Sequence, residues 1–188
     1  LKSDQEPSIR ALCGAAKNAF EGEVIPEAAP KENREKSNGE AEATVKQIHG
    51  LARTLKEALE TKAKRSLPAT HPVLAWMIDH AGTMLSLFSK GEPKDGLTPF
   101  QGLKGKPWRV APPAFAERIE YRRRTRRKFE SRWRPGVFLG VKRTTTEKIV
   151  GGADGSFVDQ SIRRVRDDER GDEELIRPIR GTPWEPIP

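Results

Sequence analysis

A stretch dense in glycine and proline, residues 89–114, most constrains how this 188-residue chain can fold. Both residue types interrupt regular secondary structure, so the stretch predicts a connector between two differently folded parts. Before it, apolar side chains recur at helical spacing, and beyond it they alternate with a period of two. The chain is therefore predicted to be an α+β protein, with helices first and a small sheet after them.

Three helical patterns and one short apolar segment precede the connector. Helices are predicted over residues 9–20, 39–64 and 72–88, and residues 24–26 are predicted as a strand at the edge or end of a sheet. The long helix is amphipathic, with a predicted buried face of Val45, Ile48, Ala52, Leu55 and Leu59.

The helix at 72–88 has the most apolar sequence in the chain. Its predicted core residues are Val73, Leu74, Met77, Ile78, Ala81, Met84, Leu85 and Phe88. Asp79, His80 and Gly82 interrupt the apolar run, so we expect a buried helix rather than a membrane span, with His80 packed and not acting as a ligand.

Five short segments of alternating apolar residues follow the connector. Their turns favour hairpins, most clearly at Asp154-Gly155, and together they predict a small β-barrel over residues 115–166. Residues 167–188 are charged and then rich in proline, which predicts a disordered tail. The predicted strands are residues 115–121, 137–141, 149–150, 157–158 and 161–165.

The net charge of +8 is concentrated in one part of the chain. Residues 67–134 carry 14 basic and 6 acidic side chains, whereas the charges of the remaining residues balance. A dense basic run within this part is expected to bind polyanions through counterion release; a solvated charged strand or a localisation signal are the alternatives. The run consists of Arg122, Arg123, Arg124, Arg126, Arg127, Lys128, Arg132 and Arg134, and it includes Trp133, which offers a stacking surface.

Two acids, Asp4 and Glu42, are separated by 37 residues. Two carboxylates brought together can hold a divalent metal beside a phosphodiester. Glu42 is followed on one helix face by Lys46, His49 and Arg53, which places a carboxylate and three possible phosphate contacts along a line. The plain alternative is an ordinary solvated helix face. The chain's single cysteine, Cys13, excludes a disulfide framework and indicates a reducing, intracellular compartment.

Four short motifs lie, in order, at residues 3–6, at 37–42, at 97–100 with 104–107, and at 132–140 with 158 and 163–165. In this order they resemble the integrase region of copia-like retrotransposon Pol polyproteins. They are similar to the second-aspartate motif, the Asn-Gly motif before the catalytic glutamate, the signature downstream of the catalytic core, and the small β module that follows it. The resemblance covers residues 1 to about 166.

The resemblance implies a polynucleotidyl transferase with a ribonuclease-H-like core, which inserts element DNA into a host genome. Asp4 and Glu42 would bind Mg²⁺ (or Mn²⁺) in the intact core, and Lys46 and His49 would contact DNA. The partners would be element ends, target DNA and further copies of the intact protein, without a membrane, in the nucleus or a cytoplasmic particle. Residues 1–66 would be the C-terminal half of the catalytic core, 67–114 an apolar helix and connector, 115–166 a DNA-binding barrel, and 167–188 the tail.

The first catalytic aspartate of the family would precede Leu1. The fold expected for this chain is therefore a truncated integrase core, mainly its C-terminal helices, followed by a small β-barrel-like domain, and the chain by itself is expected to be inactive in strand transfer. The alternative is a non-catalytic nucleic-acid-binding or chromatin-reading module derived from a transposon. A ribosomal or RNA-binding accessory protein explains the basic run but leaves the spaced acids without a role.

Overall fold

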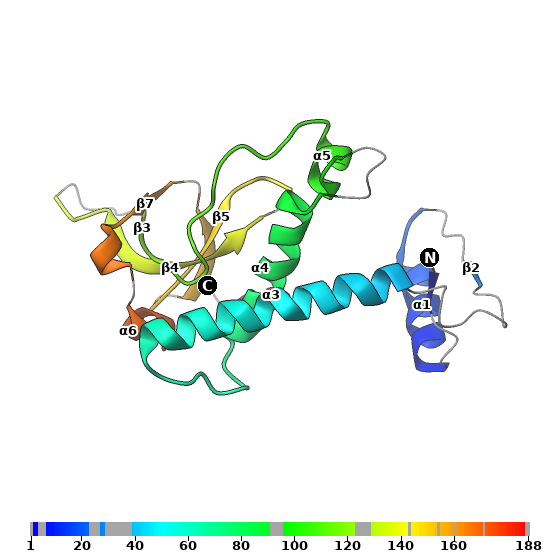
Figure 1. The fold of residues 1–188 in the computed structure, drawn as a ribbon, viewed down its shortest axis with the longest axis horizontal. Coiled ribbons are helices and arrows are strands. Elements are labelled where there is room, and N and C mark those ends of the chain that lie inside the picture. The colour runs from blue at the N-terminus through cyan, green and yellow to red at the C-terminus, as the bar shows by residue number, and fades with distance from the viewer. Residues whose placement is uncertain are drawn as a thin grey trace. The chain divides into compact units, whose positions relative to one another are not determined.

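The computed structural model describes residues 2–3, 7–22, 27–28, 39–90, 96–122, 129–142, 144–153, 155–159, 161–170 and 172–186 (Figure 1). The chain divides into two units, residues 1–47 and 48–188, and the division falls within one long helix, α3 (Gly39–Ala63). The predicted strand at 24–26 lies outside the described residues.

The first unit contains α1 (Pro7–Ala19) and two very short strands, in addition to the first turns of α3. Strands β1 (Lys2–Ser3) and β2 (Glu27–Ala28) pair in parallel. The predicted first helix is confirmed as α1, which begins at a proline, a residue suited to a first helical position. It buries no side chain, and Leu12 is 69% exposed.

Helix α4 (Val73–Phe88) and the short α5 (Pro99–Lys104), which lies within the predicted connector, also belong to the second unit. Helix α5 is defined by its ends: Thr98 and Gln101 form a capping box, and Gly105 closes the helix with a left-handed φ of 67°. No helix among the described residues is long and apolar enough to cross a membrane.

All five predicted strands are present, in one antiparallel sheet with the order β6-β5-β4-β3-β7. Strand β4 is the longest, and its pairing with β5 is irregular between Phe138 and Gly140. Gly136 allows β4 to pass close to its neighbours, because a Cβ there would lie 2.8 Å from the Gly151 carbonyl oxygen and 2.8 Å from the Tyr121 ring. The strands are β3 (Arg118–Arg122), β4 (Trp133–Val141), β5 (Lys148–Gly152), β6 (Gly155–Asp159) and β7 (Ile162–Arg164).

The sheet is open, with β6 and β7 as its outer strands, whereas a barrel was expected. It is nevertheless strongly curled. Strands β4 and β5 lie between β3 and β6 in the sheet, yet the ring centroids of Tyr121 in β3 and Phe157 in β6 are only 4.6 Å apart. The backbone N–H of Arg122 also donates to Asp159 Oδ2 at 2.9 Å, which joins the ends of the same two strands.

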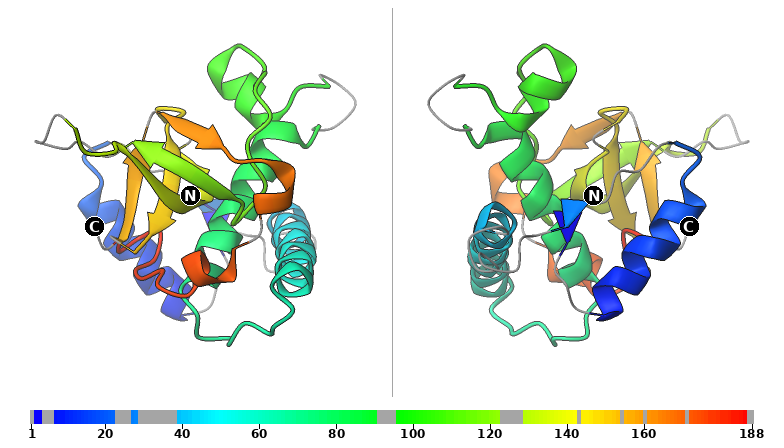
Figure 2. Two further views of the ribbon diagram at one scale, coloured as in Figure 1. Left: turned by 90° about the vertical axis from the view of Figure 1, so that its left-hand side faces the viewer. Right: turned by 90° about the vertical axis from the view of Figure 1, so that its right-hand side faces the viewer.

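Alternating residues of the sheet enter two hydrophobic clusters. Val137 and Leu139 of β4 pack with residues of α3, α4 and α6 (Glu173–Ile176), whereas Phe138 belongs to the cluster on the concave face with Ile119 and Tyr121. Figure 2 shows α4 between the sheet and α3. Helix α4 is therefore covered on two sides, which explains its apolar composition.

The buried faces of the helices differ in part from the predicted ones. Leu59 of α3 is buried, and Ala52 and Leu55 pack partly against the same cluster, but Val45 is 49% exposed. In α4 the predicted core residue Ile78 is 50% exposed. The predicted core residues Val73, Met77 and Ala81 are confirmed as buried. The other buried residues of α4 are Trp76, His80, Thr83 and Leu87.

The C-terminal segment differs from the disordered tail that was expected. Its described residues, 167–170 and 172–186, include the 3₁₀ turn η1 (Asp167–Glu169) and α6. Ile176 and Ile179 are buried in the cluster beneath the sheet, at 4% and 2% exposure. The indole N–H of Trp76 donates to the Gly181 carbonyl oxygen at 3.1 Å, so α4 holds this segment in place.

Candidate nucleic-acid interface

Only one member of the predicted acidic pair can be located. Asp4 lies outside the described residues, and Glu42 lies exposed in the first turn of α3. Within the described parts of the chain, no three His, Cys, Asp or Glu side chains gather as a group that could hold a metal ion. Since Mg²⁺ is held by several oxygen ligands, Glu42 by itself does not make a metal site.

The predicted line of side chains on α3 is exposed along its length. Lys46, His49 and Arg53 follow Glu42 at spacings of four, three and four, and the helix is continuous through them. Arg53 donates from Nε to the carbonyl oxygen of His49 at 3.4 Å, so its guanidinium lies along the helix surface. Each of these three side chains is exposed, as contact with a phosphate requires.

The basic run extends from the last residue of β3 to the second residue of β4, and the structure describes its two ends. Arg122 ends β3, and Arg132 and Arg134 flank Trp133 at the start of β4. All three arginines are exposed, and Trp133 is half-buried. Five predicted contact residues lie outside the described residues: Arg123, Arg124, Arg126, Arg127 and Lys128.

Strand pairing brings these ends together with a residue that the sequence did not single out. Arg122 pairs with Trp133 across β3 and β4, and Glu120 pairs with Arg163 across β3 and β7. The guanidinium carbon of Arg163 lies 3.8 Å from the centroid of the Trp133 ring, a cation–π contact. Arg163 therefore covers one side of the indole that was expected to stack on a base. We call Arg122, Arg132, Trp133, Arg134 and Arg163 the basic edge.

The third strand of the basic edge, β7, is held by a buried carboxylate. Glu117, whose side chain is 3% exposed, accepts hydrogen bonds from Arg164 Nε at 2.7 Å and Nη2 at 2.8 Å, and from the Ala114 N–H at 3.0 Å. Arg170 Nε lies 3.4 Å from Glu117 Oε1. Burial acts to raise the pKa of Glu117, but the hydrogen bonds from Arg164 and Ala114 outweigh it and lower the pKa. Glu117 is thus ionised and fixes the short strand that carries Arg163.

His80 is a packed residue, as predicted, and takes no part in the interface. It is 3% exposed, and its ring centroid lies 5.2 Å from that of Phe115 and 5.9 Å from that of Phe138. Its Nδ1 is buried without a hydrogen-bond partner, and burial lowers the pKa of His80 to about 4. The imidazole is therefore neutral at neutral pH.

The basic edge combines cations that can neutralise phosphates with an aromatic side chain held by a cation. Such a surface can hold a nucleic-acid backbone without reading its sequence. No family model, curated protein or solved structure matches this chain.

Proposed function

We propose that this chain is the DNA-binding part of a copia-like retrotransposon integrase, whose intact form performs metal-dependent strand transfer. The observation that carries the proposal is the basic edge, where strand pairing joins exposed arginines to an indole. Five further cations of the basic run stand between Arg122 and Arg132 in the sequence, outside the described residues.

The order of the elements supports the integrase part of the proposal. In the proposed family a helix bearing the third catalytic acid near its start is followed by further helices, a connector and a small β module. The chain has Glu42 in the first turn of α3, then α4 and α5, then a curled five-stranded sheet. On this proposal residues 1–66 are the end of a ribonuclease-H-like core, and the curled sheet is the barrel-like module.

A salt titration tests DNA binding at the basic edge. Binding of a short fluorescent DNA duplex is measured by anisotropy over a series of salt concentrations, for the wild type and for a triple variant, Arg122→Gln, Arg132→Gln and Arg134→Gln. Each lost phosphate contact lowers the slope of log affinity against log salt by about 0.9, so the triple variant loses roughly 2 to 3 units of slope.

A matched control carries Lys104→Gln, Lys106→Gln and Arg109→Gln, which removes three exposed cations away from the basic edge. It loses the same net charge and keeps the wild-type slope. Equal loss of slope in the two triple variants would show that net charge alone drives binding, and the basic edge would then have no special role.

The integrase part has its own test, in which this chain alone is expected to give no strand transfer with Mg²⁺ or Mn²⁺. In a longer protein that includes the upstream core, Glu42→Gln is expected to abolish strand transfer and leave DNA binding intact. Turnover by the longer protein that survives Glu42→Gln would remove the assigned catalytic role, while the DNA-binding result would stand.

A further inference from the structure

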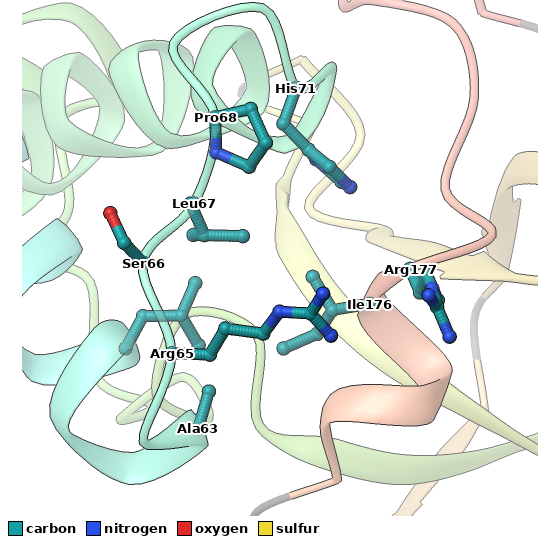
Figure 3. Close-up of a pocket in the computed structure, with 9 residues that line it drawn as sticks. Ala63, Arg65, Ser66, Leu67, Pro68, His71, Ile176 and Arg177 are labelled. Carbon is teal, nitrogen blue, oxygen red and sulfur yellow. The ribbon is translucent and has the colours of Figure 1, made fainter.

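A cavity of about 300 Å³ lies on a part of the second unit that the basic edge does not include. Its walls are the last turns of α3, the segment between α3 and α4, and α6 with the residue after it (Figure 3). The cavity is at the lower end of the range for ligand pockets, roughly 300–1,000 Å³, and suits a small molecule or one side chain. Its lining residues are Leu59, Ala63, Arg65, Ser66, Leu67, Pro68, His71, Ile176 and Arg177.

The segment between α3 and α4, which forms one wall of the cavity, is held in place by Glu60. Glu60 Oε1 accepts hydrogen bonds from the Leu67 N–H at 2.7 Å, from Ser66 Oγ at 3.0 Å and from Lys56 Nζ at 2.6 Å. The hydrogen bond from Lys56 lowers the pKa of Glu60, and the bond from Leu67 adds to this effect. The cavity is therefore formed before any ligand arrives.

His71 fixes the opposite wall. Its Nδ1 accepts a hydrogen bond from the Val73 N–H at 3.2 Å, at the start of α4. The backbone N–H of His71 donates to the Pro68 carbonyl oxygen at 2.9 Å. Burial lowers the pKa of His71, against an opposing backbone hydrogen bond at Arg177. This hydrogen bond links the segment before α4 to the residue after α6.

The lining of the cavity is apolar and basic. Leu59, Leu67 and Ile176 give an apolar floor, and the charged side chains are two arginines. In Figure 3 Arg65 extends toward Ile176. No Asp or Glu is among the nine lining residues. A ligand that matches this lining has a small apolar body and a carboxylate that a guanidinium can hold.

We propose that this cavity binds a carboxylate attached to a short aliphatic body, either a free acid or the C-terminus of a peptide that ends in an aliphatic residue. The apolar body lies on the floor of the cavity, and Arg177 at its rim holds the carboxylate. The site requires neither DNA nor the metal of the proposed function.

Backbone amide NMR shifts of the full chain test the proposal with octanoate, and with acetyl-Gly-Gly-Leu bearing a free C-terminal carboxylate. Saturable shifts at Leu67, His71 and Ile176 are expected for at least one probe, and the tighter probe identifies the source of the carboxylate. Octylamine and the amide of the same peptide are expected to cause no such shifts. If neither carboxylate probe saturates, or if the amine and amide act equally, the proposal is wrong.

Two variants locate the binding. Arg177→Gln is expected to weaken binding about tenfold, since it removes a charge-assisted hydrogen bond, and Arg180→Gln, an exposed arginine outside the lining, is expected to leave it unchanged. Ala63→Phe fills the cavity and is expected to abolish binding. Unweakened binding by both Arg177→Gln and Ala63→Phe would place the probes elsewhere and overturn the assignment.

Discussion

The buried imidazole of His80 makes the stability of the second unit depend on pH. Burial holds the pKa of His80 at about 4, against an ordinary value of 6.5, so the folded protein resists protonation that the unfolded chain accepts. Stability is therefore fully present above pH 6.5 and falls as the pH drops toward the folded pKa. Below about pH 4 the loss from this residue is complete.

The magnitude follows from the difference between the two pKa values. One pKa unit corresponds to about 1.4 kcal/mol, so the full loss is about 3 kcal/mol, and about 2 kcal/mol of it occurs between pH 7 and pH 5. His80 contacts the rings of Phe115 and Phe138, and its buried Nδ1 has no hydrogen-bond partner among the described residues, so these neighbours do not stabilise the protonated ring. The carboxylates of Glu60 and Glu117, whose pKa values are lowered, lose their contributions only below their ordinary pKa of 4.5.

The assay is urea unfolding followed by tryptophan fluorescence between pH 7 and pH 5. All four tryptophans belong to the unit that begins at Ile48, so the signal reports this unit. His71, whose pKa is also lowered, adds a pH dependence of the same sign, so the wild type is compared with His80→Phe. His80→Leu is a second choice if the phenyl ring is too large for the site.

The expected result is that the unfolding free energy of the wild type falls about 2 kcal/mol more than that of the variant over this range. A difference near zero would refute the reasoning. It would mean that the folded protein accepts the proton on His80 without loss, through a water or a rearrangement that supplies Nδ1 with a partner.

Three further substitutions, one of them with a matched control, test the packing of the second unit, each by urea unfolding. Glu117→Gln is expected to destabilise the protein by about 1–3 kcal/mol, less than the roughly 3–5 kcal/mol of a fully buried pair because the Arg164 side chain is 45% exposed; an unchanged midpoint would show that β7 does not depend on this pair. Gly136→Ala is expected to cost about 1–3 kcal/mol through its close contacts, whereas Gly102→Ala in α5, with open space around it, is neutral or slightly stabilising; equal effects would contradict the packing argument. Ile179→Ala is expected to cost about 2–4 kcal/mol, and a loss below about 0.5 kcal/mol would restore the expectation of an unpacked tail.

The fold class and the strands were predictable because their signals are local. Alternating side chains predicted all five strands, and helical spacing predicted α3 to within one residue of its end, Ala63. The sequence predicted less well which side of α4 is buried. Helix α4 contacts the sheet on one side and α3 on another, so its buried stripe depends on two neighbours, and an apolar residue such as Ile78 remains half-exposed.

The C-terminal segment shows where a local signal is too weak. Ile176 and Ile179 lie among charged residues and prolines, and two apolar residues three apart define no period. Their burial depends on a site built elsewhere, by Val137 and Leu139 of β4 and by Trp76 of α4. The composition of this segment predicted disorder, because composition gives no information on the apolar surface that α4 and β4 provide.

The arrangement of the basic edge also depends on contacts between elements that the sequence pattern does not show. Arg163 and Arg164 are adjacent and chemically identical, yet Arg163 lies over Trp133 and Arg164 binds buried Glu117. Neighbouring strand residues point to opposite faces, so the pairing register of β7 against β3 decides which arginine has which partner. A slip of one residue would exchange the faces on which the two arginines lie, which no pattern in the sequence distinguishes. The carboxylate of Glu117 favours the observed register because only Arg164 reaches it with two hydrogen bonds, and the same choice leaves Arg163 at the surface for the proposed contact with DNA.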